Sequence, residues 1–369
     1  MPQTVPPAAG GILTIDLAAI RANYALLRSR LSGAACAAVV KADAYGLGAV
    51  RVAPALADAG CRHFFVAHLD EAIALRPHLP TGAEVFVLNG LPPSAEAEAL
   101  AQNVTPVLNS LAQIDAWATL ARACGRALPA VLQVDTGMSR LGLSRDEIGV
   151  LAEDADRLNQ IALTYIMSHL ACADQPDHPL NAEQLDRFRA LRRSLPRAAA
   201  SLANSSGIFL GPDYHFDLVR PGAALYGIAP VAGRPNQMRQ VVRLHGRLIQ
   251  VREIEAGATV GYGATWRASC PRRIATVSVG YADGLPRNLG NSGNAFIGAN
   301  EVPLVGVVSM DTATLDVSNV PPDMLEPGSL VELIGDRNPL DAVARRAGTI
   351  GYEILTRLGH RYHRGYIGG

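Results

Sequence analysis

Short apolar runs alternate with amphipathic stretches along the first two-thirds of the chain, and this alternation constrains the fold more than any other feature. The runs are almost continuously apolar, which is typical of parallel strands buried on both faces of a sheet. The stretches between them carry helix-start signals, such as Asp16 before an apolar stripe and the capping-box pair Ser144 and Glu147. The eight strand candidates are 35–40, 63–67, 84–88, 104–108, 130–134, 161–167, 199–203 and 217–219.

Eight strands separated by helices predict an α/β fold with an N-terminal (β/α)8 TIM-like barrel. A doubly wound sheet is the alternative, because periodicity alone does not separate the two. Beyond Pro230 the pattern changes to strand-like runs with turns and no long helix. The sequence therefore predicts a barrel over 1–232 and a C-terminal mostly-β domain over 233–369, with which a strand at about 11–15 could pair. The runs of this domain are 242–254, 273–279, 301–308, 314–317 and 329–334, and helical pieces follow near 340–346 and 352–358.

Charge, hydropathy and cysteine content narrow the function class. Lys plus Arg equals Asp plus Glu at 33 each, so no basic excess indicates a nucleic-acid partner. No apolar stretch is long enough to span a bilayer, and the N-terminus lacks the basic and apolar parts of a secretory signal. The five cysteines are scattered without metal-ligand spacing. This usage predicts reduced thiols in a cytoplasmic protein without a metal site.

Lys41 is the only lysine in the chain, and every other basic residue is arginine. A codon bias toward arginine explains why lysine is scarce, but it does not explain why one position kept it. Because a guanidinium stays protonated, arginine cannot replace a lysine whose neutral amine must form a Schiff base. Lys41 is therefore a candidate for covalent chemistry, with a chance survivor as the alternative.

Several polar residues directly follow predicted strands. Lys41 comes after the run 35–40 and thus at the C-terminal end of the first barrel strand, where barrels of this type build their active sites. The residues placed in the same way after later strands are Arg140, His169, Asn204, Ser205 and Arg220.

Each of these residues also has a structural interpretation. A lone histidine after a strand is more often a satisfied structural residue, Asn-Ser is often a turn or a helix cap, and Arg220 could form a surface ion pair. The pair Gly222 and Ala223 could be a simple turn, or it could expose backbone amides at a helix start that holds phosphate. The agreement among the placements favours a single site.

The segment Val40-Lys41-Ala42-Asp43-Ala44-Tyr45-Gly46 resembles the pyridoxal-phosphate lysine signature of alanine racemases. The resemblance covers nearly the whole chain and preserves the order of the motifs. It implies a pyridoxal 5'-phosphate enzyme with a (β/α)8 barrel followed by a β domain. The other matching motifs lie at 134–138, 140–142, 168–171, 203–205, 219–222, 261–265, 279–284, 310–311 and 352–353.

The resemblance implies a two-base racemisation of L-alanine and D-alanine, which would supply D-alanine for peptidoglycan. Lys41 would carry the cofactor and act as one base, and Tyr262 would act as the other on the opposite face of the substrate. Since a free tyrosine has a pKa of about 10, this base needs help near neutral pH. In the family the residue matched by His169 contacts that tyrosine and the residue matched by Arg220, and such a cationic chain would favour phenolate.

Arg220 would also face the pyridine nitrogen of the cofactor. A positive donor there keeps the nitrogen unprotonated and makes the cofactor a weaker electron sink, which disfavours transamination. The cofactor would be held by Tyr45, His169, Asn204, Ser205, Arg220, Gly222, Ala223 and Tyr352, and the substrate would meet Arg140, Tyr281, Met310 and Asp311.

In the family, Tyr262, Tyr281 and Met310 enter the site from a second subunit, so the resemblance implies a homodimer with shared active sites. Two positions depart from the family pattern. Leu47 stands where a histidine is usual, and Gln133 stands where many members have a carbamylated lysine that orients the residue matched by Arg140. Glutamine cannot carry the carbamate, so a bound anion such as chloride could replace it.

Three alternatives differ in what they require of these residues. A broader-specificity or serine racemase of the same family stays open because of Gln133. A pyridoxal-phosphate decarboxylase of related fold needs a carboxylate in place of Arg220. A single-barrel protein that binds the cofactor without turnover would lack the C-terminal domain.

Overall fold

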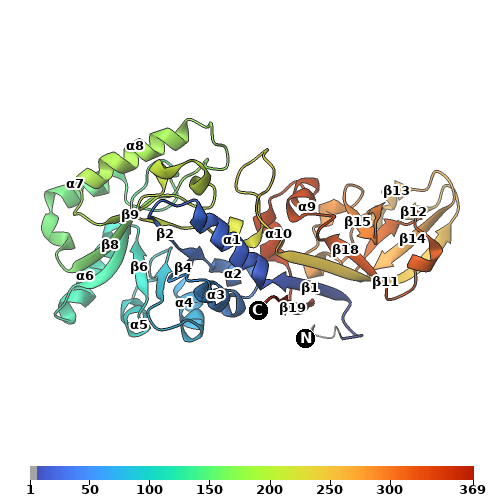
Figure 1. The fold of residues 1–369 in the computed structure, drawn as a ribbon, viewed down its shortest axis with the longest axis horizontal. Helices are drawn as coiled ribbons and strands as arrows, with labels where there is room; N and C mark the ends of the chain where they lie inside the picture. Colours follow the sequence, from blue (N-terminus) through green and yellow to red (C-terminus); the bar gives the residue numbers. More distant parts are fainter. Residues whose placement is uncertain (1–5) are drawn as a thin grey trace. The chain divides into compact units, whose positions relative to one another are not determined.

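The computed structural model describes residues 6–369, which form two compact units (Figure 1). The barrel unit comprises Arg21–Leu225 and Ala229–Gln237. The β unit comprises the described residues up to Ile20 together with Tyr226–Ile228 and Met238–Gly369. Over the described range, no helix combines the length and the apolar character that a membrane crossing requires.

All eight predicted strands of the barrel are present and run parallel, the first being split at Ala37. Strands β3 to β9 pair in chain order, and β10 pairs with β2 through Leu218 and Ala35. The amide of Arg220 donates to Ala203 O at 2.9 Å, so the ring closes between β9 and β10. A closed ring confirms the barrel and excludes a doubly wound sheet. The strands are β2 (Ala35–Cys36), β3 (Ala38–Val39), β4 (His63–Val66), β5 (Glu84–Val87), β6 (Thr105–Leu108), β7 (Leu128–Gln133), β8 (Ile161–Met167), β9 (Ala199–Ser201) and β10 (Leu218–Val219).

Three helices of the barrel unit, α1, α6 and α7, begin at a residue whose side chain accepts a backbone amide of the first turn. Asp16 Oδ1 accepts the amide of Ala19 at 2.9 Å at the start of α1, and Ser144 and Glu147 form the predicted capping box of α7. Helices α3 to α6 are drawn in blue to cyan beside the strands that they connect (Figure 1). The helices are α1 (Leu17–Ser29), α2 (Lys41–Gly46), α3 (Ala49–Asp58), α4 (Leu69–Leu75), α5 (Glu96–Ala101), α6 (Leu111–Ala123), α7 (Arg145–Glu153) and α8 (Leu180–Arg193).

The β unit is built on one mostly antiparallel sheet with the order β16-β15-β18-β11-β1-β19, and β14 and β17 continue it from β11. The N-terminal strand β1 pairs antiparallel with β11 and parallel with β19. The unit contains β1 (Gly11–Asp16), β11 (Val242–Ile254), β12 (Thr259–Val260), β13 (Trp266–Arg267), β14 (Arg272–Val277), β15 (Asn294–Ile297), β16 (Asn300–Pro303), β17 (Ala313–Asp316), β18 (Leu330–Ile334), β19 (His363–Ile367), α9 (Leu340–Arg346) and α10 (Gly351–Arg357).

One strand prediction in this unit was wrong in length. The run 301–308 was expected to be a single strand, but β16 ends at Pro303. Proline gives no amide to a neighbouring strand, and Gly306 turns the chain with a φ of 73°. Apolar residues thus continue beyond the strand into a buried loop rather than a longer sheet.

Candidate active site

Lys41 follows β3 and opens a turn of unusual handedness. Four residues after it, Ala42 to Tyr45, have φ between 53° and 56°, although none of them is glycine. A left-handed conformation costs an L-residue roughly 1–2 kcal/mol, and runs of it are rare. The surrounding structure must therefore impose this turn, as it does for strained backbone at functional sites.

Glu71, at the start of α4, supplies one of the contacts that hold the turn. Its Oε1 accepts the amide of Ala42 at 2.5 Å, and its Oε2 accepts the amides of Ala67 and His68 at 2.7 and 3.1 Å. The carboxylate thus joins the residue after Lys41 to the C-terminal end of β4. Glu71 was not predicted as a site residue, because His68 is not a usual capping residue and only folding brings Glu71 to this turn.

The surroundings of Lys41 favour its neutral amine. Burial lowers the pKa of Lys41, and the nearby Arg140 lowers it further, while Glu71 raises it. Burial and a like charge both disfavour the protonated form. A neutral amine at this position can act as a nucleophile or accept a proton.

Arg220 is 3% exposed and held by two acceptors. Its Nη2 donates to Ser168 O at 2.6 Å, and its Nη1 donates to Ser201 Oγ. Burial lowers the pKa of Arg220 to about 9, which leaves the guanidinium charged at neutral pH. Within residues 6–369 no carboxylate forms an ion pair with it, so the side chain offers a positive donor without a built-in counter-ion.

His169 follows β8 and carries no positive charge near neutral pH. Burial lowers its pKa to about 3, with further lowering by Arg220, Arg140 and Lys41. The sequence predicted a cationic chain that included this histidine. In this chain the imidazole differs from that expectation, because burial and the positive Arg220 and Arg140 favour its neutral form, and the positive charge resides on Arg220.

Small groups converge at the C-terminal ends of β9 and β10. Ser205 Oγ accepts the amides of Gly222 and Ala224 at 2.9 and 3.2 Å. A Cβ on residue 222 would clash with the hydroxyl of Tyr45, so this hydroxyl lies directly against Gly222. The hydroxyls of Ser205 and Tyr45 thus gather beside the backbone amides that follow β10, and hydroxyls and amides grouped in this way suit a phosphate group. Ala224, rather than Ala223, completes the pair of amides on Ser205.

Asn204 takes a structural position in this region. Its Oδ1 accepts the amide of Gly207 at 2.9 Å, and its backbone forms a parallel bridge with Arg220. This is the helix-cap alternative that its sequence context allowed. The bridge therefore places Arg220 beside Asn204, the residue that precedes Ser205.

A buried network that was not predicted supports the loops after β7 and β8. Thr136 Oγ1 lies 2.8 Å from Ser168 Oγ, and Gln184 Nε2 donates to Thr136 Oγ1 and to His169 O at 3.0 and 2.9 Å. Because the backbone carbonyl of Ser168 accepts from Arg220 Nη2, the network connects α8 to the guanidinium. Its members are ordinary polar residues, and only their burial in the folded chain distinguishes them.

Arg140 extends from an exposed loop whose backbone is restrained. Asp135 Oδ1 accepts the amides of Gly137, Met138 and Ser139 at 2.9, 3.0 and 3.1 Å. On the other side of Arg140, Gln133 Nε2 donates to Leu141 O at 3.2 Å. Gln133 thus braces the loop through a neutral hydrogen bond.

The remaining predicted site residues belong to the β unit. The loops of Tyr281 and Met310 are joined, because Ala282 N donates to Met310 O at 2.9 Å. Asp311 lies in the second of these loops, and its Oδ1 accepts from Arg361 Nη1 at 2.8 Å. Arg361 Nε also lies 3.1 Å from Asp283 Oδ1.

Large side chains of the β unit are unusually exposed. Tyr262 is 72% exposed, Met310 53%, Tyr281 42% and Tyr352 37%. Tyr262 stands in a short turn between Gly261 and Gly263, whose φ values of 75° and 70° favour glycine. Side chains of this size and exposure are typical of surfaces that bind a ligand or another chain.

Comparisons with known proteins agree with this arrangement. The family model for the N-terminal domain of alanine racemase matches residues 15–230, and the model for its C-terminal domain matches residues 241–366. A Mesorhizobium japonicum protein named "Alanine racemase, catabolic" is 54% identical over 362 residues, which are 98% of this chain and 94% of that protein. A Brucella abortus alanine racemase is 54% identical over 373 residues, with the same coverage.

Solved structures give the same result. The crystal structure of alanine racemase from Bartonella henselae with covalently bound pyridoxal phosphate matches with a TM-score of 0.94 at 44% identity, covering 97% of this chain and 100% of that one. The biosynthetic alanine racemase from Pseudomonas aeruginosa matches with a TM-score of 0.90 at 38% identity, covering 97% and 99%. The chain therefore belongs to the alanine racemase family of isomerases.

Proposed function

We propose that this chain interconverts L-alanine and D-alanine with pyridoxal 5'-phosphate bound at Lys41. The observation that carries the proposal is the half-buried amine of the only lysine, whose pKa is lowered by burial and by the positive Arg140. The similar Bartonella henselae protein contains covalently bound pyridoxal phosphate. The relatives and structures named above are all alanine racemases, which favours alanine over serine as the substrate.

The residues of the barrel unit fit this cofactor. Tyr45, Ser205 and Gly222 would hold its phosphate in the cradle of hydroxyls and amides. Arg220 would donate to its ring nitrogen, since the guanidinium keeps its charge and has no carboxylate partner within the described range. When bound, the cofactor supplies an electron sink that acidifies the Cα proton of the amino acid.

Inversion requires that a proton leave one face of Cα and return on the other. We propose that the Nζ of Lys41 serves one face and the hydroxyl of Tyr262 the other. Neutral His169 would accept or donate a single hydrogen bond and leave Arg220 as the positive group behind the tyrosine. Arg140 would bind the substrate carboxylate, because its guanidinium is exposed and its loop is restrained on both sides.

We further propose that a complete site needs two copies of the chain. Tyr262, Tyr281 and Met310 expose 72%, 42% and 53% of their surface, so they are accessible to a second subunit. Their burial there would remove apolar surface from water and narrow the entrance to small substrates. Shared sites of this kind make the homodimer the active species.

The cellular role is also a proposal. The racemisation would supply D-alanine for peptidoglycan, as the family resemblance implies. The relative named "catabolic" favours the opposite direction, in which one enantiomer of alanine is converted for breakdown. All five cysteines are free, which fits a reducing compartment such as the cytoplasm.

The test is incubation of the chain, saturated with pyridoxal phosphate, with L-alanine in D2O. We expect D-alanine to form and both enantiomers to acquire deuterium at Cα. Lys41→Arg is the matched variant, because it keeps a positive charge but cannot present a neutral amine. Formation of D-alanine by Lys41→Arg, or its absence with the parent chain, would refute the proposal. Parallel incubation with L-serine measures substrate breadth.

A further inference from the structure

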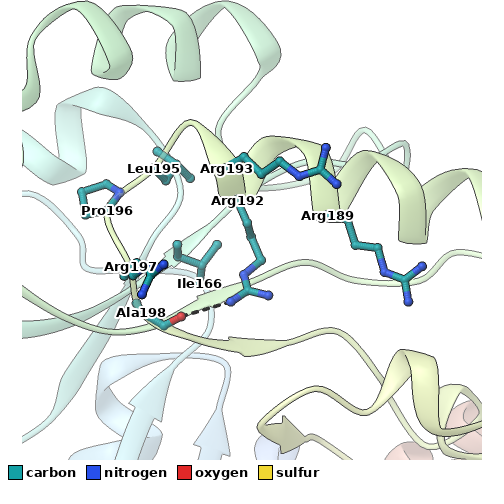
Figure 2. A pocket seen from close by; sticks show the side chains of 8 residues that line it. All are labelled: Ile166, Arg189, Arg192, Arg193, Leu195, Pro196, Arg197 and Ala198. Carbon is teal, nitrogen blue, oxygen red and sulfur yellow. Dashed lines mark hydrogen bonds between the residues drawn. The ribbon is translucent and has the colours of Figure 1, made fainter.

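A cavity of about 730 Å3 lies between the end of α8 and the loop 194–198, which leads into β9 (Figure 2). Four of its lining residues are arginines, and Ile166 and Leu195 add an apolar wall. The loop precedes β9, whereas Asn204 and the other proposed site residues of the barrel follow the strands. The cavity is thus at the end of β9 that is opposite to the candidate active site. The four arginines are Arg189, Arg192, Arg193 and Arg197.

The positive charge here is poorly compensated. Among the residues that the structure describes, Arg189 is the one arginine of the four with ion pairs, at 4.0 Å to Asp186 and 3.6 Å to Asp213, and both carboxylates are largely exposed. Long, solvated pairs of this kind contribute little. Arg193 and Arg197 have neither an ion pair nor a side-chain hydrogen bond to any residue that the structure describes.

Helix electrostatics explains part of this cluster but not all of it. Cations in the last turn of a helix interact favourably with its dipole, which accounts for Arg192 and Arg193 at the end of α8. Arg197 lies beyond the helix in the loop, and Arg189 lies a turn earlier. Helix electrostatics therefore does not account for Arg189 and Arg197 among the residues that line the cavity.

Arg192 is held in place in the cavity wall. Its Nη2 donates to Ala198 O at 3.2 Å, as the dashed line in Figure 2 marks, and its guanidinium lies 5.8 and 5.5 Å from the ring centres of Phe188 and Phe216. Its Nε is buried and has no acceptor among residues 6–369. A guanidinium that is already ordered loses little conformational freedom when it binds an anion.

We propose that this cavity binds a small phosphorylated metabolite that carries more than one phosphate group. Guanidinium groups bind phosphate oxygens in a bidentate manner, and four of them exceed what one monovalent anion would neutralise. The volume lies within the range of small-molecule sites, roughly 300–1,000 Å3. The apolar wall would contact the part of the ligand that is not phosphate. This site goes beyond the proposed racemisation and does not depend on it.

The test is calorimetric titration with inorganic pyrophosphate at constant ionic strength. The full chain is first saturated with pyridoxal phosphate and freed of the excess, so that the cofactor cradle cannot accept the probe. We expect saturable binding with one site per chain. In the double variant Arg193→Gln/Arg197→Gln, we expect the dissociation constant to rise at least about tenfold.

The matched control is Arg126→Gln/Arg145→Gln, which removes two exposed arginines of the same unit that form no side-chain hydrogen bond or ion pair within the described residues. Its net charge equals that of the test variant, and melting curves check that both fold. We expect it to bind like the parent chain. No saturable binding by the parent chain up to about 10 mM would overturn the proposal. Equal weakening in both variants, or weakening in neither, would also overturn it.

Discussion

The carboxylate of Glu71 accepts a 2.5 Å hydrogen bond from the amide of Ala42, the residue that follows Lys41. Through this bond one side chain both restrains a left-handed turn and places a negative charge near the proposed catalytic amine. Burial and the positive charge of Arg140 lower the pKa of Lys41, whereas the negative charge of Glu71 raises it. The position and the protonation of Lys41 are thus coupled to the start of α4.

Glu71→Gln should change both properties. In the variant one amide oxygen replaces the two carboxylate oxygens, and the amide NH2 group cannot accept a hydrogen bond. The backbone amides of Ala42 and Ala67 therefore can no longer both be accepted by this side chain. Without the negative charge, the pKa of Lys41 should fall further. Since the neutral amine fraction grows as pH rises through the pKa, uptake of pyridoxal phosphate by the cofactor-free chain should reach half its maximal rate at a lower pH.

Glu147→Gln is the control for this prediction. Glu147 occupies the same capping-box position in α7, and its loss should cost about 1 kcal/mol of stability, as for other helix caps. It should leave the pH of half-maximal uptake unchanged. An unchanged midpoint in Glu71→Gln would contradict the account of Lys41.

Gln133 should act on substrate binding through the loop of Arg140. Gln133→Ala removes the hydrogen bond to Leu141 O and loosens this loop. We expect KM for alanine to rise several-fold with a smaller change in kcat, because Arg140 would bind the carboxylate similarly in the ground and transition states. Gln113→Ala removes a comparable bond, to Asn89 O, in another barrel loop and should leave KM unchanged.

The dependence of activity on chloride tests whether an anion from solution binds beside Arg140. Gln133 is neutral, and no carboxylate among the described residues pairs with Arg140, so an anion from solution could take that place. Replacing chloride with gluconate at constant ionic strength should lower activity in the parent chain. A rate that is independent of the anion would show that the Arg140 loop works without one.

Protonation of His169 should destabilise the folded chain. The pKa of His169 is about 3 in the folded chain and near 6.5 in the unfolded chain. At a pH between these two pKa values, the unfolded chain binds the proton more strongly than the folded chain. Its contribution to stability is therefore present above pH 6.5 and declines as pH falls. Urea unfolding of His169→Gln should show a smaller loss of stability from pH 7 to pH 5 than the parent chain. His78→Gln, an exposed histidine of the same unit, should behave like the parent.

Shared active sites predict recovery of activity in mixed dimers. Lys41→Arg and Tyr262→Phe should each be inactive alone. After subunit exchange, half of the dimers should contain one chain of each kind, and one of their two sites would then have both Lys41 and Tyr262. The mixture should recover about a quarter of the parent activity. No recovery, despite mixed dimers seen by native mass spectrometry, would place Tyr262 in the same subunit as its Lys41.

The barrel could be predicted from the sequence because its strands are buried on both faces, as the stacked Phe65 and Phe86 illustrate with ring centres 4.6 Å apart. The short strand β19 was not predicted, since its residues are only partly buried and include Arg364 and Gly365. Leu47 departs from the family pattern yet is fully buried, so an apolar residue suits that position.

The candidate site was only partly predictable. Residues after strands could be located from the barrel topology, as Arg220 and Ser205 show. The left-handed turn after Lys41 could not, because Ala-Asp-Ala-Tyr has no glycine and the turn depends on distant Glu71. The neutral state of His169 likewise depends on burial and on charges brought together only by folding.

The most direct test of the two-base account is exchange at Cα in the Tyr262→Phe variant. The variant, loaded with pyridoxal phosphate, is incubated in D2O separately with L-alanine and with D-alanine, and deuterium and chirality are followed. With Lys41 as the one remaining base, a single enantiomer should exchange its Cα hydrogen and keep its configuration, whereas the parent chain should label and interconvert both. Labelling of both enantiomers by Tyr262→Phe, or continued racemisation at the parent rate, would contradict the assignment of Tyr262 as the second base.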